Sequence, residues 1–214
     1  VAAVGLAACS RSAPEGELTV YVAVPLSGFQ ANGGQTVLGG ARLRAEQANA
    51  QGGVLGRRVV VEAVDDEADS DVAVDVAHSV VGEIASGKEV LGLIGHYNSG
   101  QALAAMQVYD GAGVNVVTPT ASNITLTQLG YDSFFRVNGT DATQARVDAE
   151  FLVNTLGAHR IAVVHLDDDY GNGLRDLIVE SLGRLGAEVA ADIIVEEAAE
   201  RHESAVAQIQ RVQP

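Results

Sequence analysis

Two polar segments of the sequence hold residue types that suit the binding of a carboxylate. They read GHYNSG at residues 95–100 and TPTASN at residues 118–123, and each follows a short apolar run. Ser99 falls where an expected strand turns into a helix, so its hydroxyl and the following N–H groups can hold an anion at the positive helix end. Ser122 can add a second donor. The same residue types are common N-caps and turn formers, so the pattern predicts either binding loops or structural turns.

The single cysteine, Cys9, lies in a sequence typical of a bacterial lipidation site, or lipobox. Leu6 and the small residues Ala7 and Ala8 precede it; the small residues would give a signal peptidase access to the backbone, and the thiol would accept a diacylglyceryl group. Residues 1–6 would then end an apolar signal segment, and the polar residues that follow Cys9 would form a tether. The alternative is a buried cysteine in a short Ala/Val strand. In both cases the sequence offers no second cysteine for an internal disulfide.

Motifs for common enzyme chemistry are missing from the sequence. It contains no GxSxG, no GxxxxGK[ST] and no GxGxxG after the first expected strand, so hydrolysis, phosphoryl transfer and dinucleotide binding lack their groups. The five histidines are scattered, without an HExxH pair. The acidic run at residues 65–71 lacks the spacing of a calcium loop and is expected to be a solvated strand end and helix N-cap. We therefore expect a binding protein, not an enzyme, without a metal or other cofactor.

Composition and charge narrow the class of partner. The 214 residues include 13 basic and 28 acidic side chains, and the net charge of −15 repels phosphate backbones and anionic membrane surfaces. Aromatic residues make up 4% of the chain, which offers few surfaces for stacking bases. No apolar run reaches the roughly eighteen residues that span a bilayer. We expect no nucleic-acid partner and a folded part that is not embedded in a membrane.

Apolar runs alternate with amphipathic stretches from residue 18 onward, the pattern of a parallel sheet with helices on both faces. The predicted fold class is therefore α/β. Strands are expected at residues 18–24, 59–64, 90–94, 114–117, 161–165 and 188–195. Helices are expected at residues 35–50, 71–85, 101–110, 142–156, 170–185 and 204–212. Residues 118–130 are expected to form a polar loop with too few apolar side chains to join a core.

The alternation restarts after residues 134–136, which predicts a second lobe. We divide the chain into a signal remnant and tether at 1–16, a first α/β lobe at 17–137 and a partial second α/β lobe at 138–214. The second lobe has two expected strands, fewer than a stable doubly wound sheet needs. We therefore expect two doubly wound parallel-sheet lobes, the second lacking its C-terminal part, in a protein truncated here at both ends.

Several sequence blocks match one known family in order and at consistent spacing. They are residues 25–28 (PLSG), 39–41 (GGA), 49–53 (NAQGG), 65–69 (DDEAD), 94–96 (IGH), 118–123 (TPTASN), 126–131 (LTQLGY), 135–136 with Gly139 and Asp141, and 169–174 (DYGNGL). Over nearly all of residues 17–214 the chain resembles the leucine/isoleucine/valine-binding family of type I periplasmic binding proteins. The resemblance implies two α/β lobes, joined by hinge strands, that close over a ligand.

The resemblance also implies roles for particular residues. Ser99 and Ser122 match the hydroxyl positions that hold the α-carboxylate of the ligand, and Ser122 stands where a threonine is usual. Thr120 matches a position that supplies a backbone group near the α-amino end. Tyr170 matches the aromatic residue that the second lobe brings to the ligand.

Departures from the family pattern bear on the identity of the ligand. Gly33 stands where well-known members place an aromatic residue over the ligand side chain, which implies a different side-chain pocket. The acidic residue that would pair with the ligand ammonium is expected beyond Pro214. Branched-chain amino acids are the leading expectation, and amides, urea and aromatic acids are carried by relatives with this fold.

Two functions from different classes fit these features. The first is an extracytoplasmic solute-binding protein of an ABC importer, with permease subunits as partners and a lipid anchor to the membrane. The alternative is a ligand-sensing receptor ectodomain on the same fold. A lipid anchor at Cys9 favours the first, because sensors are more often tethered by a transmembrane helix. A Rossmann-type enzyme, the third possibility, lacks its phosphate loop.

Overall fold

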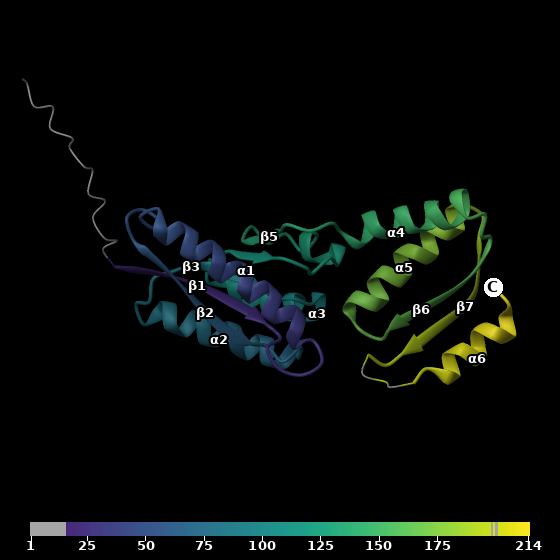
Figure 1. The fold of residues 1–214 in the computed structure, drawn as a ribbon, viewed down its shortest axis with the longest axis horizontal. Helices are drawn as coiled ribbons and strands as arrows, with labels where there is room; N and C mark the ends of the chain where they lie inside the picture. The colour runs from purple at the N-terminus through teal and green to yellow at the C-terminus, as the bar shows by residue number, and fades with distance from the viewer. Residues whose placement is uncertain (1–15, 198, 200) are drawn as a thin grey trace, which may run out of the picture.

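The computed structural model describes residues 16–197, 199 and 201–214, so Cys9 lies outside the described residues. The described chain forms two α/β lobes that lie end to end along the longest axis of the molecule (Figure 1). We call the five-stranded sheet and its helices, residues 17–136, the first lobe, and the two-stranded sheet and its helices, residues 141–214, the second lobe. The predicted α/β class with a parallel sheet is confirmed. The domain boundary between residues 137 and 138 stays a prediction.

The first sheet is parallel throughout and has the strand order β2-β1-β3-β4-β5. Its strands are β1 (Glu17–Val24), β2 (Arg58–Asp65), β3 (Val90–Gly95), β4 (Val116–Thr118) and β5 (Phe134–Arg136). Val22, Ala23 and Val24 on β1 are fully buried, because helices cover both faces of a doubly wound sheet. All carboxyl ends meet at one edge of the sheet, so the loops that follow β3 and β4 are neighbours.

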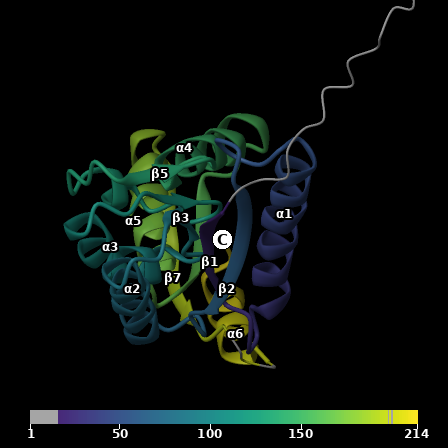
Figure 2. The same cartoon turned by 90° about the vertical axis from the view of Figure 1, so that its left-hand side faces the viewer.

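Helices cover both faces of the first sheet (Figure 2). Helix α1 (Ala31–Ala50) lies on one face, and α2 (Ser70–Ala85) and α3 (Ser99–Gly111) lie together on the other. The larger core lies under α2 and α3, and its largest fully buried side chains are Tyr109, Leu93, Met106, Leu126 and Val80. Helix α1 begins four residues before its predicted start at Gln35, because the glycine- and asparagine-containing first turn hides its helical periodicity.

The end of β3 requires a glycine. Gly95 has a φ of 144°, and a Cβ atom at this position would lie 2.1 Å from the carbonyl oxygen of Ala23 on the neighbouring β1. A side chain there would force β1 and β3 apart. The close approach fixes where the loop that leads to Ser99 leaves the sheet.

Residues 118–130 differ from the predicted polar loop. They contain the 3₁₀ helix η1 (Ile124–Thr127), and Leu126 and Ala121 are buried in the core. Local hydrogen bonds turn these apolar side chains inward: the Thr118 hydroxyl oxygen accepts the N–H of Ala121 at 3.0 Å, and Asn123 caps η1. The prediction that this segment stays out of the core is therefore wrong. Strand β5 was also not expected, because three residues are too few to show an alternating pattern.

The second lobe is built on the parallel pair β6 (Arg160–Leu166) and β7 (Glu188–Val195). Helices α4 (Asp141–Glu150) and α5 (Asp169–Arg184) lie on one side of this pair, and α6 (Glu203–Val212) lies on the other (Figure 1). Leu182, Val163 and Val153 form the centre of its core. The predicted helix at 142–156 is divided into α4 and a π-helical turn, η2 (Phe151–Thr155).

Candidate functional site

A cavity of about 630 Å³ lies between the two lobes, at the carboxyl-end edge of the first sheet. Its walls come from the loops after β3 and β4, from the connection between the lobes and from α4 and α5. The lining residues are Tyr97, Asn98, Ser99, Thr120, Ala121, Ser122, Asn138, Gly139, Thr140, Thr143, Gln144, Val147, Asp148 and Tyr170. All four predicted ligand-binding residues are among them. In open α/β sheets, ligands bind in such a crevice beyond the strand ends.

Ser99 is the first residue of α3 and is almost completely buried. Its Oγ accepts the backbone N–H of Asn123 at 3.2 Å. A hydroxyl has one proton to donate besides its acceptor sites, so this bond leaves the Ser99 O–H free to donate. Within the described residues, the N-cap Asn98 makes no side-chain hydrogen bond to the first turn of α3. The start of α3 therefore offers hydrogen-bond donors suited to an anion.

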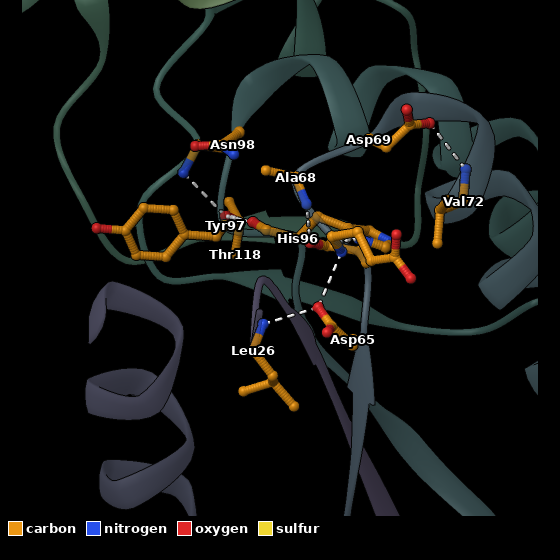
Figure 3. Close-up of polar contacts among 12 residues, drawn as sticks. Leu26, Asp65, Ala68, Asp69, Val72, His96, Tyr97, Asn98 and Thr118 are labelled. Carbon is orange, nitrogen blue, oxygen red and sulfur yellow. Dashed lines mark hydrogen bonds and ion pairs between the residues drawn. The ribbon is translucent and has the colours of Figure 1, made fainter. Parts of the chain in front are cut away.

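A buried polar pair supports the loop that carries Ser99. His96 Nδ1 lies 2.7 Å from Asp66 Oδ2, and both side chains are fully buried. His96 Nε2 lies 3.3 Å from the hydroxyl oxygen of Tyr109, and the backbone carbonyl of His96 accepts the Thr118 hydroxyl at 2.8 Å. In Figure 3, His96 lies close to Thr118, and the side chains of Tyr97 and Asn98 point away from it. Three neighbouring segments thus fix the backbone two residues before Asn98.

Thr120 and Ser122 come from the loop after β4. The hydroxyl of Thr120 donates to the carbonyl of Tyr97, and the carbonyl of Thr120 accepts the Asn138 side chain at 2.9 Å. A carbonyl oxygen can accept a second hydrogen bond, so the Thr120 carbonyl can also receive a ligand N–H. The carbonyl of Ser122 accepts the N–H of Asp141 at 3.0 Å, which ties this loop to the start of α4.

Tyr170 lies in the first turn of α5 and brings the second lobe to the cavity. The residue is 38% exposed. Asp168 caps α5 by accepting the N–H of Gly171 at 2.5 Å, which fixes the turn that holds the phenol. Partial burial raises the pKa of Tyr170, and the negative charge of Asp141 raises it further. The phenol is therefore a neutral hydrogen-bonding group at physiological pH.

The structure adds lining residues that the sequence pattern did not single out. Tyr97 and Asn98 directly precede Ser99, so their position in the same polar loop could have indicated that they line the cavity. The residues contributed by α4, such as Gln144 and Asp148, read in the sequence as an ordinary solvated helix face. Only the packing of the lobes shows that this face lines the cavity.

The cavity has little charge. Among the described lining residues, Asp148 is the one acidic side chain, and none is a lysine or arginine. A ligand carboxylate would therefore be held by hydroxyls, N–H groups and the α3 dipole, while Asp148 favours a cationic group nearby. This arrangement suits a zwitterion better than a dianion.

Side-chain amides also join the two lobes beside the cavity. Asn98 donates to Gln30 Oε1 at 2.7 Å, and Gln30 donates to Glu197 Oε1 at 2.5 Å. Gln30 belongs to the first lobe and Glu197 to the second. A lining residue is thus linked through one intermediate side chain to the opposite lobe.

The acidic run after β2 serves local structure. Asp69 caps α2 by accepting the N–H groups of Asp71 at 2.8 Å and Val72 at 3.1 Å, which confirms the predicted N-cap. The prediction that the whole run is solvated is wrong, because Asp66 is fully buried beside His96. Asp65 accepts the N–H of Leu26 at 2.7 Å and so ties the ends of β1 and β2 together (Figure 3). No cluster of three or more His, Cys, Asp and Glu side chains suited to a metal ion occurs in the described part of the chain.

The helices described by the structure include none with both the length and the apolar character needed to cross a bilayer.

Comparison with known proteins identifies the family. A family model described as periplasmic binding protein matches residues 17–214. An amino acid binding protein from Pseudomonas aeruginosa is 34% identical over 170 residues, covering 79% of this chain and 44% of that protein. A leucine-specific-binding protein from Salmonella typhimurium is 30% identical over 189 residues, covering 88% of this chain and 50% of that protein.

A solved structure is also similar to this chain. The ABC transporter substrate-binding protein from Desulfitobacterium hafniense in complex with Leu has a TM-score of 0.72 and 26% identity, covering 92% of this chain and 56% of that chain. The present chain spans about half the length of the curated relatives it matches. These relatives are named as binding proteins and not as enzymes. The chain therefore belongs to the periplasmic binding protein family.

Proposed function

We propose that the full-length protein captures a small amino acid or amide outside the cytoplasm and delivers it to an ABC importer. The observation that carries this proposal is that Ser99, Thr120, Ser122 and Tyr170 line one cavity between the lobes, although they lie up to 71 residues apart in the sequence. Family membership implies an extracytoplasmic location. Relatives named for binding amino acids support the ligand class, and an ABC transporter substrate-binding protein supports the transport role.

The binding mode follows from the groups around the cavity. The hydroxyls of Ser99 and Ser122 and the first N–H groups of α3 would hold the ligand α-carboxylate. The Thr120 carbonyl would accept from the α-ammonium, with Asp148 adding a favourable negative field. Tyr170 would cover the ligand from the second lobe. The protein would use no cofactor and perform no chemical step on its ligand.

Branched-chain amino acids are the leading ligands, and small amides are the runner-up. Relatives named for leucine binding favour the former. The side-chain end of the cavity favours neither strongly, because among the described lining residues only Ala121 and Val147 are aliphatic. Polar groups such as Asn138 and Gln144 complete the wall and could serve an amide.

A thermal-shift panel on the full-length protein tests this function. The panel holds leucine, isoleucine, valine, alanine, small amides, urea and benzoate. A ligand at a hundred times its Kd stabilises the folded state by about 2.7 kcal/mol, which raises the melting temperature by several degrees. We expect such a shift for at least one amino acid or amide. No shift for any of them would contradict the proposal.

We further propose that Cys9 carries a lipid anchor, with ABC permease subunits as the membrane partner. The support is the order of small residues, cysteine and polar tether in the sequence. Cys9→Ala in the intact precursor should move the protein from the membrane pellet to the soluble fraction, whereas Ser12→Ala should leave it in the pellet. Retention of the Cys9→Ala variant after a high-salt wash would contradict the anchor.

A further inference from the structure

Asn123 lies where the ligand cavity, the first lobe and the second lobe meet. Its backbone N–H donates to Ser99 Oγ at 3.2 Å. Its side-chain Nδ2 donates to the carbonyl oxygen of Asp169 at 2.7 Å, across the boundary between the lobes. Asp169 directly precedes Tyr170 at the start of α5. One buried residue of the first lobe therefore touches both a cavity hydroxyl and the turn that carries the aromatic side chain.

The other polar groups of Asn123 hold it in one orientation. Oδ1 accepts the N–H of Thr125 at 2.9 Å, and the backbone carbonyl accepts the Arg136 guanidinium at 3.1 Å. Exchanging the amide oxygen and nitrogen would break the bonds to both Thr125 and Asp169. The donor toward the second lobe is thus assigned by its surroundings.

Two glycines make this contact possible. A Cβ atom at Gly173, on α5, would lie 2.8 Å from Asn123 Nδ2. A Cβ atom at Gly100, on α3, would lie 2.9 Å from Asp169 Oδ2. The first turns of α3 and α5 therefore approach Asn123 and Asp169 so closely that there is no room for a side chain between them.

We propose that Asn123 is a positioning residue, which rests on the proposed function above: it couples Ser99 to the start of α5 and so sets Tyr170 over the cavity. When a ligand accepts a hydrogen bond from the Ser99 hydroxyl, Asn123, which contacts Ser99, also holds the start of α5 in place. Loss of the Asn123–Asp169 hydrogen bond leaves the carboxylate-binding groups intact, but Tyr170 is no longer held in position over the cavity. The contact then acts mainly on the rate at which ligand leaves.

Two variants of the full-length protein remove the contact in different ways. Asn123→Asp keeps the oxygen that caps η1 but replaces the donor with a negative oxygen facing the Asp169 carbonyl. Gly173→Ala crowds the Asn123 amide, while alanine favours the helical conformation of α5. The matched control is Asn172→Asp, which removes a side-chain amide bond to Asp167 Oδ1 of 2.9 Å that stays within the second lobe.

Stopped-flow measurements use the member of the thermal-shift panel that wild type binds most tightly. We expect dissociation to be at least about fivefold faster in Asn123→Asp and Gly173→Ala, the factor that one typical hydrogen bond supplies. The association rate should be nearly unchanged. The double variant should release the ligand no faster than the single variant with the faster dissociation. Equal dissociation rates in wild type and both variants, or an equal effect of Asn172→Asp, would overturn the proposal.

A second measurement needs no ligand. Hydrogen exchange at the amides of residues 170–174 should be faster in ligand-free Asn123→Asp and Gly173→Ala than in wild type and Asn172→Asp. Unchanged exchange in both variants would overturn the positioning role. If wild type binds no member of the panel, the proposed function fails, and this exchange measurement decides the role of Asn123 by itself.

Discussion

The phenol oxygen of Tyr97 lies against Gly33, where a Cβ atom would come within 2.7 Å of it. Gly33 belongs to α1, and Tyr97 comes from the loop after β3 and lines the cavity. The sequence resemblance implied a different side-chain pocket because Gly33 replaces an aromatic residue. In the structure, the space over Gly33 is filled by an aromatic ring from another element.

Gly33→Ala should displace the Tyr97 ring and change ligand selectivity. A change of one methyl group in a pocket alters discrimination by about 1–3 kcal/mol, so the ratio of Kd values for leucine and valine should change by about fivefold or more. Gly39→Ala on the same helix is the control, because no described neighbour lies within 4 Å of its added Cβ. Calorimetric titration of both variants checks this, and an unchanged ratio in Gly33→Ala would argue against Tyr97 as part of the side-chain pocket.

Asp66→Ala should destabilise the first lobe through its buried partner. In wild type, His96 Nδ1 lies 2.7 Å from Asp66 Oδ2, and the substitution leaves this nitrogen without that partner in a fully buried environment. We expect a loss of about 3 kcal/mol in the free energy of unfolding, measured by urea denaturation. The exposed Asp75→Ala on α2 should change it by less than about 0.5 kcal/mol. Similar losses in the two variants would contradict the supporting role of the pair.

The pH dependence of stability should change when Asp141 is replaced. Asp141 is fully buried, and burial raises its pKa, although the Ser122 hydroxyl and the Arg136 charge act in the opposite direction. Between the ordinary and the raised pKa, the folded protein keeps a proton that the unfolded chain has released. The free energy of unfolding therefore falls as pH rises through this window.

Asp141→Asn carries no such proton, so its stability relative to wild type should increase as the pH rises above the ordinary aspartate pKa of about 4. Urea denaturation at several pH values measures the difference. The exposed Asp132→Asn, measured at the same pH values, provides the matched control. A constant or decreasing difference for Asp141→Asn would mean that burial does not control this carboxyl group.

Sequence periodicity was sufficient for most of the fold. The regular apolar runs predicted β1, β2 and β7 to within about a residue or two at their ends, because these strands are long enough to show a continuous run. Short elements escaped it. Strand β5 has three residues and helix η1 has four, which is too short for a periodic pattern. Their positions depend instead on neighbours such as Asn123 and Thr118.

Only part of the candidate site could be predicted from the sequence. Ser99 and Tyr170 lie in loop-to-helix junctions, where glycines and hydroxyls give a local signal. Val147 and Asp148 lie on one face of α4, and their place in the cavity depends on how the lobes pack. The contact between Gly33 and Tyr97 joins residues 64 positions apart, and glycine by itself does not indicate which side chain lies above it.

We propose that Ser99 and Ser122 hold the carboxylate of a small amino acid in the cavity between the lobes. Calorimetric titration of full-length wild type, Ser99→Ala, Ser122→Ala and the exposed control Ser79→Ala tests this directly, using the amino acid of the panel that wild type binds most tightly. A hydrogen bond to a charged group contributes about 1.5–3 kcal/mol, so each cavity variant should bind roughly ten- to a hundredfold more weakly. Ser79→Ala should bind as wild type does. Unchanged affinity in both cavity variants would contradict the account.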